Sequence, residues 1–148
     1  MLSIPPPVWT IVWVLIAAGT SYLLGWPHVP GLSQVPLAVV LIVLGTTSAA
    51  SAALLFRGED TELNPTSTSN SKLVTSGPFR ITRNPMYLGL VLVTLGIAFW
   101  MGAWPMFLTP IAIFATLNWV HIPFEEAKMR RQFSQSFESY SHKVRRWL

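Results

Sequence analysis

Four apolar runs alternate with short polar or turn-forming segments along the chain. The first two, residues 8–24 and 35–56, carry no charged side chain and have about the length a helix needs to cross a bilayer. The third and fourth, residues 88–101 and 106–123, are shorter, and Pro110 interrupts the fourth. The pattern predicts an all-α integral membrane protein with about four transmembrane helices, the last two forming a short, tilted or partly inserted hairpin.

The remaining C-terminal stretch, residues 124–148, has a different pattern. Large apolar side chains recur there at spacings of three and four, and lysines and arginines surround them. This spacing predicts an amphipathic basic helix on the membrane surface, with the apolar stripe as its membrane-contact face. The stripe consists of Phe133, Phe137, Tyr140, Val144 and Trp147.

The second apolar run ends in a segment of small residues, GTTSAASAA at residues 45–53. Small side chains let two helix backbones approach closely, so we expect this face to pack on a neighbouring helix. The same face could mediate self-association, and the sequence leaves the oligomeric state open.

Composition and charge support the membrane assignment. Hydrophobic residues make up 51% of the chain and charged residues only 11%, against about 25% charged in a typical soluble domain. Every charge falls within residues 57–83 or 125–146. The net charge of +4 beside apolar segments favours contact with anionic lipid headgroups over nucleic acid. Cysteine is absent, which excludes disulfides and thiolate sites, and the three widely spaced histidines predict no metal site.

The charges also predict a topology. The turns at residues 25–34 and 101–105 contain no lysine or arginine, whereas both charged blocks follow an even-numbered span. The positive-inside rule therefore places both blocks, and both termini, in the cytoplasm of a multi-pass protein.

Candidate chemistry concentrates in residues 72–87. Ser76-Gly77-Pro78 is a turn, and Asn84-Pro85 is a helix-start signal with Asn84 as the cap. Arg80 and Arg83 lie between them, and with free backbone N–H groups they would offer a seat for a carboxylate or phosphate. We expect Glu125 and Glu126, which follow the fourth run, to form the other wall of a site.

Each feature also has a purely structural interpretation. Arg80 and Arg83 are equally compatible with anchoring to headgroups. The glutamate pair would favour the N-terminal dipole of the surface helix. His121, taken alone, fits a helix-interface histidine.

Taken together, these pieces resemble the isoprenylcysteine carboxyl methyltransferase family and the related phospholipid methyltransferases. The family pattern runs Leu-Val-Thr-x-Gly-Pro-Tyr-Arg, Arg-His-Pro-x-Tyr, an apolar hairpin, Glu-Glu, then Phe-Gly-x-x-Tyr-x-x-Tyr and a basic end. The resemblance covers residues 61–148. The matching segments are Leu73-Val74-Thr75-Ser76-Gly77-Pro78-Phe79-Arg80, Arg83-Asn84-Pro85-Met86-Tyr87, Glu125-Glu126, Phe133-Ser134-x-x-Phe137-x-x-Tyr140 and Val144-Arg145-Arg146-Trp147.

The resemblance implies a membrane-embedded methyltransferase that uses S-adenosyl-L-methionine. The absence of a Gly-rich dinucleotide-binding motif agrees with this. It also implies a single domain in which residues 1–56 supply two spans and residues 57–148 the cofactor-binding loop, hairpin and C-terminal helix. The acceptor would be a lipophilic small molecule or a lipid-modified substrate. The cofactor-binding residues implied are Asn64, Ser71, Lys72, Leu73, Val74, Phe79, Arg83, Asn84, Pro85, Met86, Tyr87, Glu125 and Glu126.

Three departures from the family pattern bear on the acceptor. Asn84 replaces a histidine, and Phe79 replaces a tyrosine. His121 stands where the isoprenylcysteine enzymes have an arginine that approaches the methyl acceptor. We therefore take His121 as the acceptor-side candidate, able to act as a base toward an amine or hydroxyl acceptor, while a carboxylate acceptor would need no base.

Two other functions compete with methyl transfer. One is a nicotinamide-dependent lipid or sterol-type reductase, whose members share a similar C-terminal helical arrangement but are much larger. The other is a non-catalytic membrane subunit. Binding of S-adenosylmethionine would separate the first function from the other two.

Overall fold

The computed structural model describes residues 4–58 and 73–148. The described chain is helical, which confirms the predicted all-α class. The helices are α1 (Pro6–Leu23), α2 (Val35–Gly58), α3 (Pro85–Met101), α4 (Leu108–Thr116) and α5 (Ile122–Lys143), with 3-10 turns η1 (Gly77–Arg80) and η2 (Trp104–Phe107) and a π-helical turn η3 (Leu117–His121).

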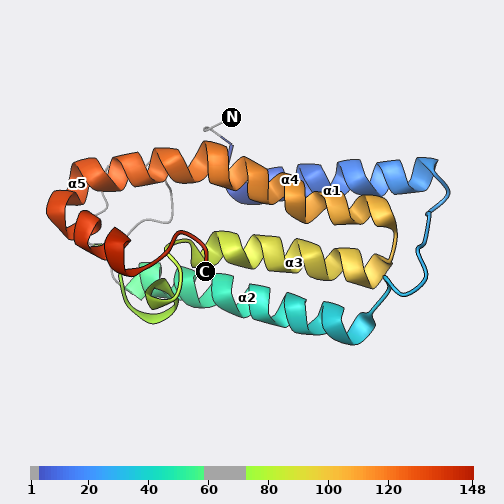
Figure 1. Ribbon diagram of the computed structural model, residues 1–148, viewed down its shortest axis with the longest axis horizontal. Helices are drawn as coiled ribbons and strands as arrows, with labels where there is room; N and C mark the ends of the chain where they lie inside the picture. Colours follow the sequence, from blue (N-terminus) through green and yellow to red (C-terminus); the bar gives the residue numbers. More distant parts are fainter. Residues whose placement is uncertain (1–3, 59–72) are drawn as a thin grey trace.

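The helices form an elongated bundle of two layers (Figure 1). Helix α1 lies beside α4 in one layer, and α2 lies beside α3 in the other, with α3 also contacting α4. Helix α5 continues in line with α4, extends past the start of α1, and then turns back toward the beginning of α3. The candidate chemistry of the chain gathers where α5 meets α3.

The outer surfaces of the bundle suit a bilayer. Helices α1 and α2 are long and apolar enough to span a membrane, as is the continuous helical stretch from Trp104 to Lys143, while α3 is shorter. Their outward side chains are strongly exposed, among them Leu15, Leu23 and Val43. An apolar surface of this extent is stable against lipid but not against water. The chain is therefore a multi-pass membrane protein.

Close packing of α2 on α3 uses the small residues of the second apolar run. A Cβ atom built on Gly89 would lie 2.5 Å from the Gly45 carbonyl oxygen and 2.9 Å from the Ala49 Cβ. A Cβ on Gly96 would lie 2.9 Å from the Ala38 carbonyl oxygen. The predicted helix-packing face is thus covered by α3 of the same chain at Gly45 and Ala49, while Thr46, Thr47 and Ala50 stay exposed.

The two uncharged turns meet at one end of the bundle. The Val29 N–H donates to the Gly102 carbonyl at 3.4 Å, and the Trp104 N–H donates to the Pro27 carbonyl at 3.3 Å. Gly102 ends α3 with a φ of 66°, a conformation that glycine adopts without strain. The described charged residues lie toward the other end. The two turns that the charge pattern placed on the same side of the membrane thus lie at the same end of the bundle. The assignment of the charged end to the cytoplasm stays a prediction.

No break separates the fourth apolar run from the C-terminal helix, although we expected the run to end at Pro123. Proline lacks an N–H and its ring crowds the carbonyl four residues earlier. The chain accommodates Pro123 by widening the preceding turn, where the Ile122 N–H bonds to the Leu117 carbonyl in a π-helical pattern. The helix therefore continues from α4 into α5 without a loop.

The reversal of α5 occurs at Ser134, whose φ of 42° and ψ of −117° are not helical. Beyond this kink the predicted membrane-contact stripe turns partly toward the protein. Phe137 is buried, the Tyr140 hydroxyl donates to the Phe79 carbonyl at 2.7 Å, and Trp147 stacks near Phe114. These three aromatic side chains hold the C-terminal segment on the bundle instead of facing lipid.

Candidate functional site

Tyr87 and Glu125 join the starts of α3 and α5. The Tyr87 hydroxyl donates a hydrogen bond to Glu125 Oε1. The Tyr87 ring is buried in an apolar cluster with Ile113, Leu117 and Ile122. Because burial fixes the ring, its hydroxyl orients the carboxylate. The result is a positioned acidic group at the charged end of an apolar bundle.

Glu126 is held on both sides by arginines. Arg83 Nη2 lies 2.8 Å from Glu126 Oε1, and Arg146 Nη2 lies 2.7 Å from Glu126 Oε2. The Glu126 side chain is 9% exposed, so its charge depends on these partners. The hydrogen bonding of Arg146 to Glu126 raises the pKa of Arg146 above its ordinary value. We call these three residues the Glu126 cluster. Its geometry is that of a structural clamp.

The last residues of the chain, 144–148, form a strap that we name the C-terminal strap. The Arg83 N–H donates to the Arg145 carbonyl at 2.9 Å, and the Thr82 hydroxyl donates to the Arg146 carbonyl at 3.0 Å. Trp147 Nε1 donates to Asn118 Oδ1 at 3.1 Å. The strap thereby ties the segment before α3 to the π-helical turn η3.

Asn84 and Pro85 start α3 as predicted, but Asn84 does not cap the helix. Its side chain makes no capping hydrogen bond; Nδ2 donates instead to the Arg146 carbonyl at 2.9 Å. The Pro85 carbonyl accepts a hydrogen bond from the Ser48 hydroxyl at 2.9 Å. Met86 packs against the clusters around Tyr87 and around Phe79. Asn84, Pro85 and Met86 therefore form the protein surroundings at the start of α3, next to Tyr87.

The side chains of Arg80 and Arg83 lie in different places, so the two residues do not form the anion-binding site that we expected from the pair. Arg83 Nη1 donates to the Ser141 carbonyl at 2.8 Å and to the Val144 carbonyl at 3.2 Å, in addition to its bond with Glu126. The 3-10 turn η1 ends at Arg80, and Arg80 lines a pocket away from this cluster. The side-by-side arrangement required a regular helix through residues 80–83, which the chain does not form.

The predicted loop residues take three different places. Asn64, Ser71 and Lys72 lie outside the described residues. Val74 and Phe79 are buried against α2, where the Phe79 and Phe56 rings meet edge to face at 5.3 Å. Leu73 lines the pocket that includes Arg80. The structure thus brings Arg83, Asn84, Pro85, Met86, Tyr87, Glu125 and Glu126 together, and it places Leu73, Val74 and Phe79 in other surroundings.

His121 ends the π-helical turn one turn before Glu125. Its side chain is 2% exposed, and its Nε2 atom has no hydrogen-bond partner among the described residues. A buried imidazole nitrogen without a partner is costly unless another group uses it. Single-turn π-helical segments are also frequent at functional sites. His121 is therefore a buried imidazole one turn from Glu125 with a ring nitrogen that no described residue satisfies.

Two residues of this region had no predicted role. Asn118 accepts hydrogen bonds from Trp147 and, at 3.4 Å, from Arg146 Nη1. Arg146 completes the Glu126 cluster. A lone asparagine within an apolar run was a usable signal for Asn118, because an amide in a membrane segment needs a partner. Arg146 is one of several basic residues near the end of the chain, and the sequence does not distinguish it.

Comparison with known proteins identifies the family. The chain matches the phospholipid methyltransferase family over residues 33–136. It is 35% identical over 63 residues to an uncharacterised protein of Haemophilus influenzae, an alignment that covers 43% of this chain and 100% of that protein. No solved structure matches the chain. Because the match to the family covers more than half of the chain, the chain belongs to the phospholipid methyltransferase family.

Proposed function

We propose that this protein transfers a methyl group from S-adenosylmethionine to a lipophilic acceptor at the cytoplasmic face of the membrane. The observation that carries the proposal is the Tyr87–Glu125 hydrogen bond at the junction of α3 and α5, one turn from the buried His121. Membership in a membrane methyltransferase family supports the reaction class. The charged end of the bundle would face the cytoplasm, where soluble cofactors are available.

The residues around Glu125 fit this cofactor. A carboxylate oriented by a phenol hydroxyl accepts hydrogen bonds from a ribose diol and provides the countercharge for a sulfonium. Glu126 is committed to Arg83 and Arg146, so we assign contact with the cofactor to Glu125 and a supporting role to Glu126. Tyr87 and the chain from Asn84 to Met86 would form the adjoining wall. We assign Leu73, Val74 and Phe79 a supporting role because they pack elsewhere.

The protein's part in the reaction is alignment, exclusion of water and handling of one proton. The cofactor supplies a methyl group on a positively charged sulfur, which is already an activated leaving group. Tyr87 and Glu125 would fix the orientation of the bound groups, and the apolar cluster of Ile113, Leu117 and Ile122 excludes water. His121 Nε2 would accept the proton of an amine or hydroxyl acceptor. An isoprenylcysteine-like carboxylate would leave His121 in a positioning role.

Calorimetric titration of S-adenosylhomocysteine, the demethylated product, into detergent-purified protein tests the proposal. We expect saturable binding by the natural chain that Glu125→Gln weakens at least tenfold. Glu138→Gln is the matched control, because Glu138 is an exposed glutamate of the same helix. Equal binding by Glu125→Gln would refute the site. No binding by natural protein with a cooperative melting transition would refute the cofactor, and saturable NADPH binding would favour the reductase.

A further inference from the structure

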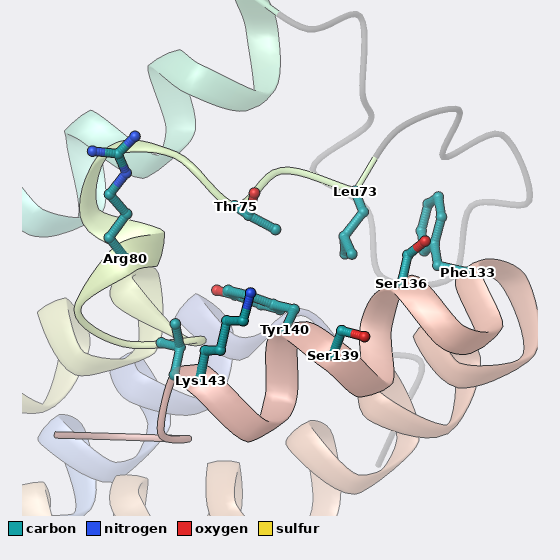
Figure 2. Close-up of a pocket in the computed structure, with 9 residues that line it drawn as sticks. Leu73, Thr75, Arg80, Phe133, Ser136, Ser139, Tyr140 and Lys143 are labelled. Carbon is teal, nitrogen blue, oxygen red and sulfur yellow. The ribbon is translucent and has the colours of Figure 1, made fainter.

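A pocket lies at the charged end of the bundle, between residues 73–75 and the last turns of α5 (Figure 2). It has a volume of about 760 Å³. None of Tyr87, His121, Glu125 or Glu126 lines it, and of the residues that the family resemblance assigns to the cofactor only Leu73 does, so the pocket is distinct from the Tyr87–Glu125 site. The pocket is lined by Leu73, Thr75, Arg80, Phe133, Ser136, Ser139, Tyr140, Lys143 and Val144.

The charge of this pocket is positive and uncompensated within the described chain. Among the described residues, Arg80 and Lys143 are the charged ones that line the pocket, and no described carboxylate lines it. Neither cation has an ion pair or hydrogen bond with the residues that the structure describes, in contrast to Arg83 and Arg146, which both bind Glu126. Two unpaired cations on one concave surface favour an anionic ligand.

The other lining residues supply both hydroxyl groups and apolar surface, and each wall of the pocket carries both (Figure 2). Thr75, Ser136 and Ser139 contribute hydroxyls that can donate to anionic oxygens. Figure 2 shows the Lys143 ammonium beside the Tyr140 ring and below Thr75, with Leu73 pointing toward the same ring. The Tyr140 hydroxyl is committed to the Phe79 carbonyl, so the pocket meets mainly the apolar face of this ring.

We propose that this pocket binds the phosphate of an anionic, apolar-tailed ligand, of which an anionic phospholipid is the obvious membrane source. Lys143 and the hydroxyls would hold the phosphate, Arg80 would add positive charge at the edge of the pocket (Figure 2), and Leu73, Phe133 and Val144 would contact the first carbons of the tail. Anionic lipid headgroups are concentrated where basic residues border a membrane span. The site is independent of methyl transfer and does not rest on the proposed function.

The test uses the full chain in a neutral detergent and three probes: dihexanoyl-phosphatidylglycerol, dihexanoyl-phosphatidylcholine and inorganic phosphate. Binding is measured by calorimetry for the natural chain and for Arg80→Gln/Lys143→Gln. Arg131→Gln/Arg145→Gln removes the same charge from exposed side chains outside the pocket. We expect saturable binding of phosphatidylglycerol, at least tenfold weaker in the pocket variant, unchanged in the control and absent for phosphatidylcholine.

The remaining measurements identify the source of the ligand and test whether the variants fold. Phosphate binding that also depends on Arg80 and Lys143 would support the pocket and point to a free phosphate or phosphorylated metabolite. The charge-conserving Arg80→Lys/Lys143→Arg variant should retain binding, and all variants should keep the melting temperature of the natural chain. Equal loss in both charge-removing variants, or no saturable binding of either anion, would overturn the proposal.

Discussion

Arg146 binds Glu126 through two hydrogen bonds across twenty residues of chain, from Nε to Oε1 at 3.2 Å and from Nη2 to Oε2 at 2.7 Å. This pairing closes the C-terminal strap over the junction of α3 and α5. It also fixes the residue next to Glu125, the carboxylate that we assign to the cofactor. The end of the chain is therefore part of the framework that holds the candidate site.

Replacing Arg146 by glutamine should lower both stability and cofactor affinity. The largely buried Glu126 would keep Arg83 but lose two charge-assisted hydrogen bonds, which we expect to cost about 1–3 kcal/mol. Thermal unfolding in detergent measures the first effect, and S-adenosylhomocysteine titration measures the second. Arg145→Gln is the control because its side chain is exposed. An unchanged melting temperature for Arg146→Gln would show that the clamp contributes nothing.

Replacing Tyr87 by phenylalanine should weaken cofactor binding with little change in fold. The ring would still fill the apolar cluster around Ile113, whereas Glu125 would lose the hydroxyl that orients it. We expect the affinity for S-adenosylhomocysteine to fall about tenfold, equivalent to ~1.4 kcal/mol. Calorimetry on Tyr87→Phe, with Tyr22→Phe as an exposed control, would measure this. Unchanged affinity in Tyr87→Phe would show that the Tyr87 hydroxyl has no role in cofactor binding.

Replacing His121 by asparagine should reduce turnover much more than cofactor binding. Loss of a general base typically costs 10²–10⁴-fold in rate, roughly. Methyl incorporation from radiolabelled S-adenosylmethionine into an extract of membrane lipids measures turnover, and its pH dependence separates a base from a packing residue. A parallel loss of S-adenosylhomocysteine affinity would place His121 in the cofactor pocket. An unaltered rate and pH profile would leave His121 as an interface residue.

Gly89→Ala should destabilise the bundle, because the new methyl group would meet the Gly45 carbonyl at 2.5 Å. Helices α2 and α3 would have to separate, at a cost of about 1–3 kcal/mol. Gly19→Ala is the matched control on α1, since a Cβ atom added there would have no neighbour within 4 Å. The control should be neutral or stabilising by up to about 1 kcal/mol through helix propensity. Melting temperatures of both variants in the same detergent measure these effects. Equal shifts in melting temperature for Gly89→Ala and Gly19→Ala would refute the close approach of α2 and α3.

Ser134→Gly should stabilise the kink of α5. Ser134 adopts a φ of 42° and a ψ of −117°, a region that glycine occupies without steric cost. The related methyltransferases have glycine at this place in the pattern. We expect an increase of about 1 kcal/mol in the free energy of unfolding, read as a higher melting temperature. Ser139→Gly, within the helical part of α5, should have the opposite effect. A destabilised Ser134→Gly protein would contradict the backbone conformation assigned to this kink.

The sequence alone determined the class of this protein. Continuous uncharged runs of about 20 residues, with every charge in two blocks, indicate helices in a membrane, because a helix satisfies all its backbone polar groups within one such segment. The small residues of the second run predicted close helix packing, and Asn84-Pro85 predicted the start of α3. The ordered motifs from Leu73 to Trp147 indicated the methyltransferase family. These features are local, so they can be read from residue type and spacing.

The tertiary structure alone decided which polar groups meet. Adjacent glutamates have different surroundings, since Glu125 bonds to Tyr87 while Glu126 bonds to Arg83 and Arg146. Likewise Arg80 and Arg83, three residues apart, serve different surfaces. Helix α5 passes Pro123 without a break and reverses at Ser134, which brings the chain's end back to its middle. Such contacts depend on the path of the whole chain, which cannot be predicted from the type of one residue and its neighbours in the sequence.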